Sequence, residues 1–388
     1  MFLRNHLDEL LSYEQSPAVS MYLPTHPAGP EARQDEIRLR NLLSAAADRL
    51  AAREWRRPDI EALLQPARRL VNDIDDEEFW RYQQHGLAVF IAPGFDRVHK
   101  LPIEVPEELG IAEHFRVRPL LPLIEAPGSF WVLALSGVRT RLYQGSRWSF
   151  AEIGGLDLPQ GLPEIWGETE YEEARKASAT GRNLHASGGV AQPQAFGETP
   201  GELHKAQLIE LLHRIAAAVE PVIKRQPAPV ILAAEPKVQG HFRELAKWKE
   251  LLPGGILEFA DAMPDKELHD KAWQAFAPLA EQARADALGR LLSLLGNHSK
   301  ATTEPEEIVK AARYARIDRL FLSDGQPPLW GFFDEAEDRV VIHPEPAEGD
   351  DDLLDYAALM TLRQGGNVTL ADRTQLPPAT PAAAILRY

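Results

Sequence analysis

The residues with the clearest capacity for chemistry form the short segment 187–192, which reads Ser-Gly-Gly-Val-Ala-Gln. The adjacent glycines Gly188 and Gly189 let the backbone pass where side chains would clash. The amide of Gln192 offers hydrogen-bond donors and an acceptor, which makes it the candidate catalytic residue. Such a tip suits entry into a crowded, RNA-lined site, whereas spacing alone favours a plain Gly-Gly turn.

Other polar residues surround this segment. Arg182 and Lys205 flank it with positive charge, and His185 lies three residues before Gly188. Together with the two glycines, these side chains are the candidate RNA-contacting residues of the loop tip.

A long amphipathic helix that begins near Pro200 must position these residues. Thr199 suits the cap, Pro200 suits the first helical position, and Glu202 completes a capping box. The loop before it, residues 178–199, is long for a compact domain, and such loops are usually functional or disordered. Apolar residues then recur at three- and four-residue steps, which predicts one buried stripe of Leu208, Leu211, Leu212, Ile215, Val219 and Val222.

The remaining side chains point to no other established chemistry. The chain contains no cysteine, which excludes disulfides, cysteine-ligated metals and a cysteine nucleophile. It also contains no HExxH pair, Walker loop, dinucleotide-binding GxGxxG or GxSxG elbow. We therefore predict no resident metal and no cofactor.

Two acidic stretches are open to more than one interpretation. Asp157, Glu164, Glu168 and Glu170 lie near a predicted sheet edge and could in principle bind magnesium, but a solvated acidic loop is the commoner case. The run 350–352 has the same simple interpretation as a solvated stretch, reinforced because negative charge is favourable at the start of a helix.

Composition and charge limit the classes of partner. The 388 residues carry a net charge of −16, so a general basic surface for nucleic acid is excluded and any RNA contact must be local or held by another protein. Residues 127–262 are the least acidic part, with 14 Lys+Arg against 16 Asp+Glu. The N-terminus does not read as a signal peptide and no apolar run is long enough to span a membrane, so we expect a cytoplasmic protein without DNA or membrane partners. The oligomeric state is not indicated.

The element pattern predicts an α/β (α+β) protein of three domains, residues 1–126, 127–262 and 263–388. Proline punctuation marks the first boundary. Buried strands are expected at 87–91, 130–135 and 229–234, and short strands at 18–24 and 256–259, with turns at Gln144-Gly145 and at Gly254-Gly255. The main helices are expected at 31–52, 58–72, 238–250, 265–295 and 303–316, the last opened by a capping box at Thr303, and at 353–363, ended by Gly365-Gly366.

Three stretches resemble the bacterial relatives of the archaeo-eukaryotic peptide-chain release factors. They are residues 20–26 (SMYLPTH) with the following 29–31 (GPE), residues 130–145 (FWVLALSGVRTRLYQG) and residues 352–388, which begin DLLDYAALMTLRQGG. The resemblance implies an RNase H-like middle domain and a C-terminal domain like those of ribosomal L7Ae-type proteins.

The same resemblance implies a role for the loop. Release factors carry a Gly-Gly-Gln loop just before a long helix, and this loop promotes peptidyl-tRNA hydrolysis on the ribosome. Here Gly188 and Gly189 match, whereas Val190 occupies the third position and Gln192 follows two residues later. Residues 1–126 contain a single lysine, Lys100, which suits mRNA decoding poorly.

Three hypotheses follow. The leading one is a ribosome-associated factor similar to release or rescue factors, without strict Gly-Gly-Gln hydrolysis, whose partners are the ribosome and its rRNA or tRNA. The second is an enzyme, either a peptidyl-tRNA hydrolase that uses Gln192 or a nuclease that uses carboxylates such as Asp157. The third is a non-ribosomal adaptor or stress-response protein that keeps only the fold.

Overall fold

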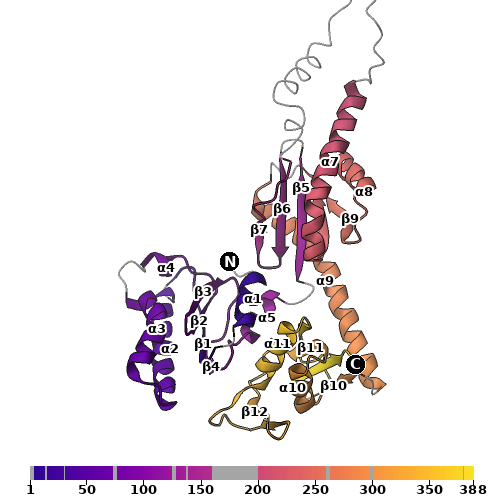
Figure 1. The fold of residues 1–388 in the computed structure, drawn as a ribbon. Coiled ribbons are helices and arrows are strands. Elements are labelled where there is room, and N and C mark those ends of the chain that lie inside the picture. Colours follow the sequence, from indigo (N-terminus) through magenta and orange to yellow (C-terminus); the bar gives the residue numbers. More distant parts are fainter. Residues whose placement is uncertain are drawn as a thin grey trace, which may run out of the picture. The chain divides into compact units, whose positions relative to one another are not determined.

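The computed structural model describes the chain except for residues 1–3, 14, 30, 73–76, 125–127, 137–138, 160–199, 259–262, 298–299 and 379. The chain forms two compact units (Figure 1). Unit 1 combines Met1–Ala126 with Gln282–Tyr388, and unit 2 is the continuous segment Pro127–Glu281. Helix α9, Asp265–Gly296, runs through the division.

Unit 2 is built on a five-stranded sheet of order β7-β6-β5-β8-β9. Strands β5, β6 and β7 form an antiparallel meander, and β8 and β9 extend it in parallel with β5. This is the strand order of the RNase H-like fold that the resemblance implied. The elements are β5 (Ser129–Leu135), β6 (Thr140–Ser146), β7 (Phe150–Glu152), α7 (Pro200–Arg225), β8 (Val230–Ala233), α8 (Pro236–Leu245), β9 (Leu251–Ile256) and the start of α9.

Alternation along β5 gives this sheet two buried faces, since successive side chains of a strand point to opposite sides. Trp131, Leu133 and Leu135 pack in one core with apolar residues of α7 and α8. Phe130, Val132 and Ala134 pack in the other core, which includes Leu268 and Phe276 of α9. A strand buried on both faces reads as a continuous apolar run, which is why the sequence revealed it.

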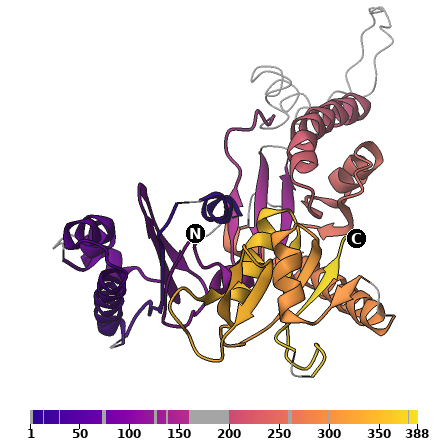
Figure 2. The same ribbon diagram turned by 60° about the horizontal axis from the view of Figure 1, so that its bottom comes forward.

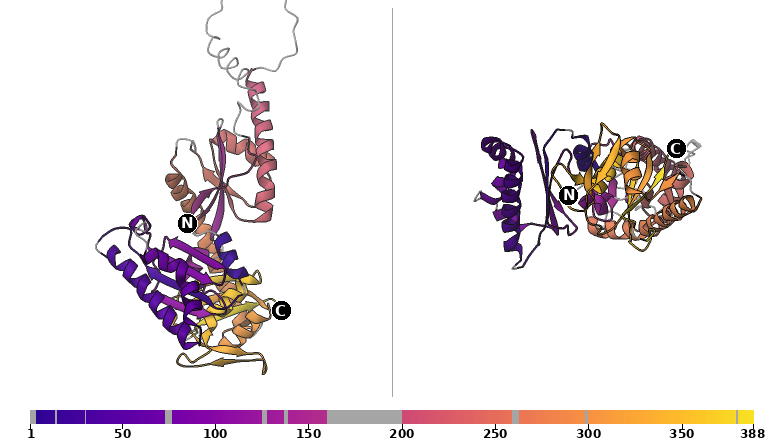
Figure 3. Two further views of the ribbon diagram at one scale, coloured as in Figure 1. Left: turned by 60° about the vertical axis from the view of Figure 1, so that its left-hand side comes forward. Right: turned by 90° about the horizontal axis from the view of Figure 1, so that it is seen from below.

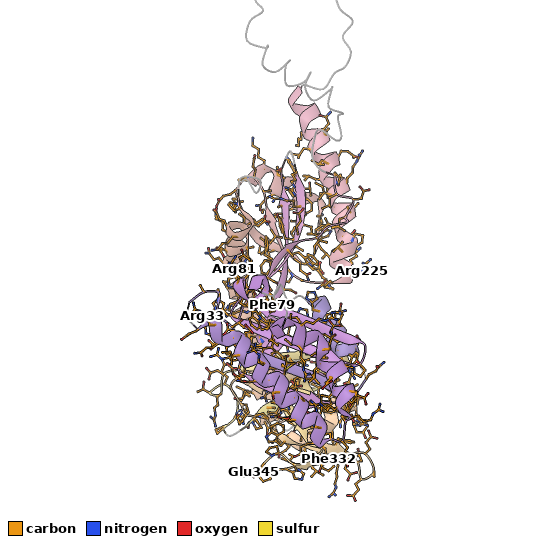
Figure 4. The ribbon with its side chains drawn as sticks, turned by 90° about the vertical axis from the view of Figure 1, so that its left-hand side faces the viewer. Arg33, Phe79, Arg81, Arg225, Phe332 and Glu345 are labelled. Atoms are coloured by element: carbon orange, nitrogen blue, oxygen red, sulfur yellow. The ribbon has the colours of Figure 1, made fainter. Side chains whose placement is uncertain are left out.

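Unit 1 contains a sheet from each end of the chain. The N-terminal sheet has the order β3-β2-β1-β4, and α2 and α3 cover one of its faces (Figures 2 and 3). Figure 4 looks onto this helical layer, which carries the exposed Arg33. The elements are α1 (Arg4–Ser12), β1 (Ala18–Pro24), α2 (Ala32–Ala52), α3 (Arg57–Asn72), α4 (Glu77–Arg81), β2 (Gly86–Ala92), β3 (Phe95–Leu101), β4 (Glu108–Ala112), the 3-10 helix η2 (Arg118–Leu120) and α5 (Leu121–Ile124).

The C-terminal sheet has the order β10-β16-β11-β15, with β11 and β15 parallel, and a small second sheet has the order β13-β12-β14. One apolar core is shared between the two ends of the chain, because Tyr22, Phe90 and Phe115 belong to the same cluster as Leu320, Leu354 and Leu359. The elements are β10 (Ala301–Thr302), α10 (Pro305–Arg313), β11 (Ile317–Ser323), β12 (Trp330–Asp334), β13 (Arg339–Ile342), β14 (Asp351–Asp352), α11 (Leu353–Arg363), β15 (Asn367–Ala371) and β16 (Ala382–Leu386).

The mixed α/β class is confirmed. The N-terminal sheet, the sheet of unit 2 and the C-terminal sheet lie one in each of the three segments proposed as domains. The three-domain division with its boundaries, and the L7Ae-like character of the last segment, stay predictions.

Two expected turns are wrong because their glycines lie inside strands, where Gly145 and Gly255 allow close packing. Gly145 lies inside β6, where an added Cβ would approach the Phe130 ring to 2.5 Å. Gly254 and Gly255 lie inside β9, which replaces the strand expected at 256–259. An added Cβ at Gly255 would approach the Gln239 side chain to 2.5 Å, and that side chain donates hydrogen bonds to the carbonyls of Ala234 and Ile256.

The capping box expected at Thr303 is also wrong. Helix α10 starts at Pro305 with Glu304 as its N-cap and without a side-chain cap. Proline at the first helical position sets this start, so the capping position falls one residue later than the pattern indicated.

Candidate functional site

Helix α7 is the rigid support for the predicted loop, and it begins at Pro200 as expected. The predicted stripe packs in the core of unit 2, and Leu211 is the first fully buried residue from Lys205 onward, where the structure describes the side chains of the helix. The turns before Leu211 therefore extend past the sheet (Figures 1 and 3). Buried apolar contact fixes the later part of α7 against the core of unit 2.

The structure places only one of the predicted loop residues. Lys205 is exposed on the early part of α7. Arg182, His185, Gly188, Gly189 and Gln192 lie outside the described residues. Their roles stay predictions, and the described geometry does not bring Lys205 together with them.

The carboxylates of the nuclease hypothesis are not brought together in the described part of unit 2. Asp157 is exposed, and Glu164, Glu168 and Glu170 lie outside the described residues. Within the described strands of this sheet the single carboxylate is Glu152, which lies 3.4 Å from Arg139. No group of three histidine or acidic residues suited to a metal ion occurs among the residues that the structure describes.

A buried charged network joins the two ends of the chain in unit 1, and sequence reasoning missed it. We call it the Arg116 network. Arg116 pairs with Glu108 and lies 3.7 Å from Asp351, while Arg118 pairs with Asp352 at 3.1 Å. The members are Glu108, Arg116, Arg118, Asp351, Asp352 and Asp355.

The carboxylates of this network also bind backbone. Asp352 is the N-cap of α11 and accepts hydrogen bonds from the N–H groups of Leu329 and Leu354. Asp355 accepts from the N–H groups of Val117, at 2.9 Å, and Arg118, at 2.6 Å. The helix-start interpretation of the acidic run is thus confirmed for Asp352, but its solvated interpretation is wrong, because Asp352 is 1% exposed.

Burial dominates the electrostatics of these carboxyl groups, because it disfavours the charged form. Burial, with the nearby charge of Asp352, raises the pKa of Asp355 to about 7. Burial likewise raises the pKa of Asp351 to about 6, although Arg116 acts in the opposite direction. The network is therefore sensitive to pH near neutrality.

The strand that carried part of the family resemblance supports this network. The Tyr22 hydroxyl donates to the Arg116 carbonyl at 2.6 Å, and the Ser20 hydroxyl accepts from the Arg116 N–H at 3.0 Å. Residues 20–26 and the stretch that begins at Asp352 therefore meet in one place. The family resemblance was the only sequence signal that singled out these two stretches. Neither stretch contains a pattern that indicates which distant residues it contacts.

The end of the same strand carries a second polar cluster. His26 contacts Asp35 through Nδ1 at 2.9 Å and through its backbone N–H at 2.7 Å. Arg38 also binds Asp35, and Glu31 lies 3.2 Å from the other ring nitrogen of His26. Because Asp35 is fully buried and paired, these contacts fix the start of α2 against β1.

The comparison with protein families bears on the middle of the chain. Residues 129–316 match the family model described as Bacterial archaeo-eukaryotic release factor family 3. This stretch is release factor-like. It spans the whole sheet of unit 2, α7 and the segment that precedes α7, so the resemblance to the bacterial archaeo-eukaryotic release factor-like proteins is confirmed over this range.

Solved structures with likeness to the chain have low identity. An archaeal translation termination factor, aRF1, is 12% identical with a TM-score of 0.24, and 99% of this chain and 96% of that chain are covered. Ribosome-bound archaeal Pelota is 12% identical with a TM-score of 0.36, covering 75% and 72%. Dom34 of S. cerevisiae is 12% identical with a TM-score of 0.35, covering 78% and 74%. At these scores the likenesses support no shared activity or partner.

No curated protein matches the chain. Among the described helices, none combines the length and the apolar character that crossing a membrane requires.

Proposed function

We propose that this protein is a ribosome-associated translation factor similar to release or rescue factors. The observation that carries the proposal is the family match over residues 129–316, which includes both α7 and the Gly188-Gly189 segment. The ribosome, through rRNA or tRNA, is the proposed partner. With Val190 at the third position of the motif, the protein acts without strict Gly-Gly-Gln hydrolysis.

The form of α7 supports this proposal. A helix fixed by a buried stripe from Leu211 onward and exposed at Lys205 presents the preceding segment from a rigid base. Two glycines in that segment suit close approach of backbone to a crowded partner surface. The net charge of −16 makes a general electrostatic attraction to RNA unfavourable, so binding depends on this local contact.

The first test is sedimentation of the purified protein with ribosomes at low and moderate salt. We expect salt-sensitive association of the wild type, because contacts to phosphate release counterions. The double variant Gly188→Ala, Gly189→Ala should lose most of this association. Absence of the wild type from every ribosomal fraction would overturn the proposal and favour a non-ribosomal adaptor.

Matched glycine substitutions control for nonspecific effects. Gly240 in α8 and Gly289 in α9 have no atom within 4 Å of an added Cβ. The double variant Gly240→Ala, Gly289→Ala should therefore fold and sediment with ribosomes like the wild type. An equal loss of ribosome association in both double variants would show that the Gly188-Gly189 segment has no specific role in binding.

Charge substitutions on α7 provide a second readout. Lys205 and Lys224 are both exposed and lie near opposite ends of the helix. We expect Lys205→Ala to weaken association and Lys224→Ala to leave it unchanged. The reverse pattern would assign ribosome contact to the other end of α7.

A peptidyl-tRNA hydrolysis assay separates this function from an enzyme. We expect no release by the wild type above the level of the Gln192→Ala variant. Release that depends on Gln192 would replace the proposal with a hydrolase, and RNA cleavage that depends on Asp157 would replace it with a nuclease.

A further inference from the structure

A cavity of about 660 Å³ lies in unit 1, at the carboxyl ends of the parallel strands β11 and β15. Its lining comes from residues within 104–109, 116–122 and 323–330, together with Arg49 and with Leu370 of β15. Ligands of open α/β sheets bind outside the carboxyl ends of parallel strands. The volume falls in the usual range of sites for small molecules.

Two buried polar groups of this cavity have neither a hydrogen-bond partner nor an ion-pair partner among the described residues. They are the hydroxyl of Ser323, a residue 4% exposed, and Nε of Arg116, whose side chain is 7% exposed. Buried polar groups in native proteins are normally paired, so each such group calls for an explanation. Both groups can donate, but neighbouring atoms cover them, so a ligand with acceptor atoms would satisfy them once the two side chains turn toward the cavity.

The same wall offers a planar surface. The Arg116 guanidinium lies over the Trp330 ring, with its carbon 5.5 Å from the ring centroid. Both residues line the cavity, and Trp330 is partly exposed instead of packed in a core as strand-borne aromatics usually are. The ion pair with Glu108 holds Arg116 in place. Nucleobases stack on tryptophan rings and on arginine planes.

The rim has a different character from the deep wall. Glu104, Glu107 and Asp324 line the cavity and are exposed. Arg49, also on the rim, donates to the Leu109 carbonyl at 3.0 Å. Carboxylates accept hydrogen bonds from ribose hydroxyls, as in dinucleotide-binding folds, whereas they repel phosphate.

We propose that this cavity binds a guanine nucleoside, with the base against Trp330 and Arg116 and the ribose at the acidic rim. Guanine presents two adjacent acceptors, O6 and N7, which suit arginine and serine donors. Adenine places an amino donor where guanine has O6, and this donor would face the donors of the deep wall. The proposal does not depend on the loop before α7 or on ribosome binding.

Equilibrium dialysis of the full-length protein with tritiated guanosine tests the proposal. We expect saturable binding, with adenosine competing roughly tenfold less well or worse. Ser323→Ala should weaken binding roughly three- to tenfold, as for loss of one hydrogen bond. Trp330→Leu should weaken it roughly tenfold or more, as for loss of base stacking.

Matched variants show whether these losses belong to the cavity. Ser293 is exposed on α9, and Trp148 is partly buried in unit 2, so Ser293→Ala and Trp148→Leu should bind guanosine like the wild type. Thermal melting of every variant separates lost binding from lost folding. Ser323→Ala removes only a hydroxyl group, so its effect on guanosine binding can be measured even if Trp330→Leu does not fold.

The rim gives an independent readout. GMP should compete less well than guanosine for the wild type. The double variant Glu104→Gln, Glu107→Gln should reduce this difference in competition between GMP and guanosine.

A short single-stranded RNA that ends in a 3′ guanosine shows whether the ligand is an RNA end or a free nucleoside. Stronger competition by this RNA than by guanosine indicates an RNA end, and weaker competition indicates the free nucleoside. The proposal is overturned if neither guanosine nor this RNA binds, or if Ser323→Ala and Trp330→Leu bind unchanged.

Discussion

Unit 2 is one continuous segment, whereas unit 1 is assembled from the two ends of the chain. Within the described residues, the only buried charged side chain of unit 2 is Arg141, while unit 1 buries Asp35, Arg116, Asp352 and Asp355. In unit 1 the hydrogen bond from the Val117 N–H to Asp355 spans 238 residues of sequence.

This contrast suggests why the charges are placed as they are. An apolar face accepts many partners, whereas a buried carboxylate is stable only opposite the donors that match it. In unit 1 the two chain ends must find one arrangement, and we interpret the Arg116 network as the specificity element for that arrangement. Unit 2 forms from neighbouring segments and needs fewer such elements.

Separation of the units should have the largest effect. We expect residues 127–281 expressed alone to fold and unfold cooperatively, because both faces of their sheet are covered within the segment. Residues 1–126 alone should bind a hydrophobic dye, because their apolar core is completed by residues such as Leu354 and Leu359. Circular dichroism with dye fluorescence measures both, and a cooperatively folded 1–126 would contradict the comparison.

A matched pair of core substitutions should have the next largest effect. Phe115 in unit 1 and Phe276 in unit 2 are each 1% exposed. Truncation of either residue to alanine should cost about 3–5 kcal/mol, from lost apolar contact and the cavity left behind. Peptide-resolved hydrogen exchange should show Phe115→Ala loosening residues from both ends of the chain and Phe276→Ala loosening only unit 2. Equal loosening of both units by either variant would show that the units unfold together.

The pH response of the Arg116 network provides a smaller and more specific test. Because the pKa of Asp355 is raised to about 7, the folded state binds more protons than the unfolded state between the two pKa values. The contribution of this group is present at low pH and is lost as the pH rises through about 7. An asparagine side chain is neutral at every pH, so the variant Asp355→Asn does not lose this contribution. The unfolding free energy of the variant relative to the wild type should therefore be higher at about pH 8 than at about pH 5, by at least about 1 kcal/mol.

Calorimetry at the two pH values measures this shift. The exposed Asp338 serves as the control position. Its pKa is lowered by the hydrogen bond that it accepts from Tyr314, so the relative unfolding free energy of Asp338→Asn should not rise between the two pH values. A pH-independent effect of Asp355→Asn would mean that Asp355 stays ionised in the folded state.

Exposed ion pairs should show the smallest effects in both units. Glu210 pairs with Arg214 on α7 in unit 2, and Glu9 pairs with Arg97 in unit 1, with all four side chains more than 40% exposed. Glu210→Gln and Glu9→Gln should each change the unfolding free energy by less than about 1 kcal/mol, because solvent screens such pairs. Thermal unfolding measures both changes. A larger decrease in unfolding free energy for either variant would show that exposed ion pairs contribute substantially to stability.

The sequence was sufficient wherever the signal is local. The strand at 18–24, the helix start at Pro200, the long helix from Asp265 and the left-handed Gly365 after α11 all follow from spacing, capping and backbone preference. Residue patterns within a few positions encode these features. The candidate loop was also found this way, from two glycines before a capped helix.

Local sequence patterns gave wrong predictions where contact with a distant residue determines the local structure. Gly145 and Gly255 read as turn residues, yet each lies in a strand because another side chain occupies the space of a Cβ. Trp330 lies in strand β12, where an aromatic residue would usually pack in a core, but it lines a cavity.

The α/β class, most elements and the family resemblance could be predicted from the sequence, because periodicity and motifs are properties of short segments. Three features depend on how distant segments pack: the two chain ends share one core, Asp352 is buried beside Arg118, and Ser323 and Trp330 line one cavity. The physical reason is that burial and pairing depend on which distant segments meet, and composition cannot specify that meeting.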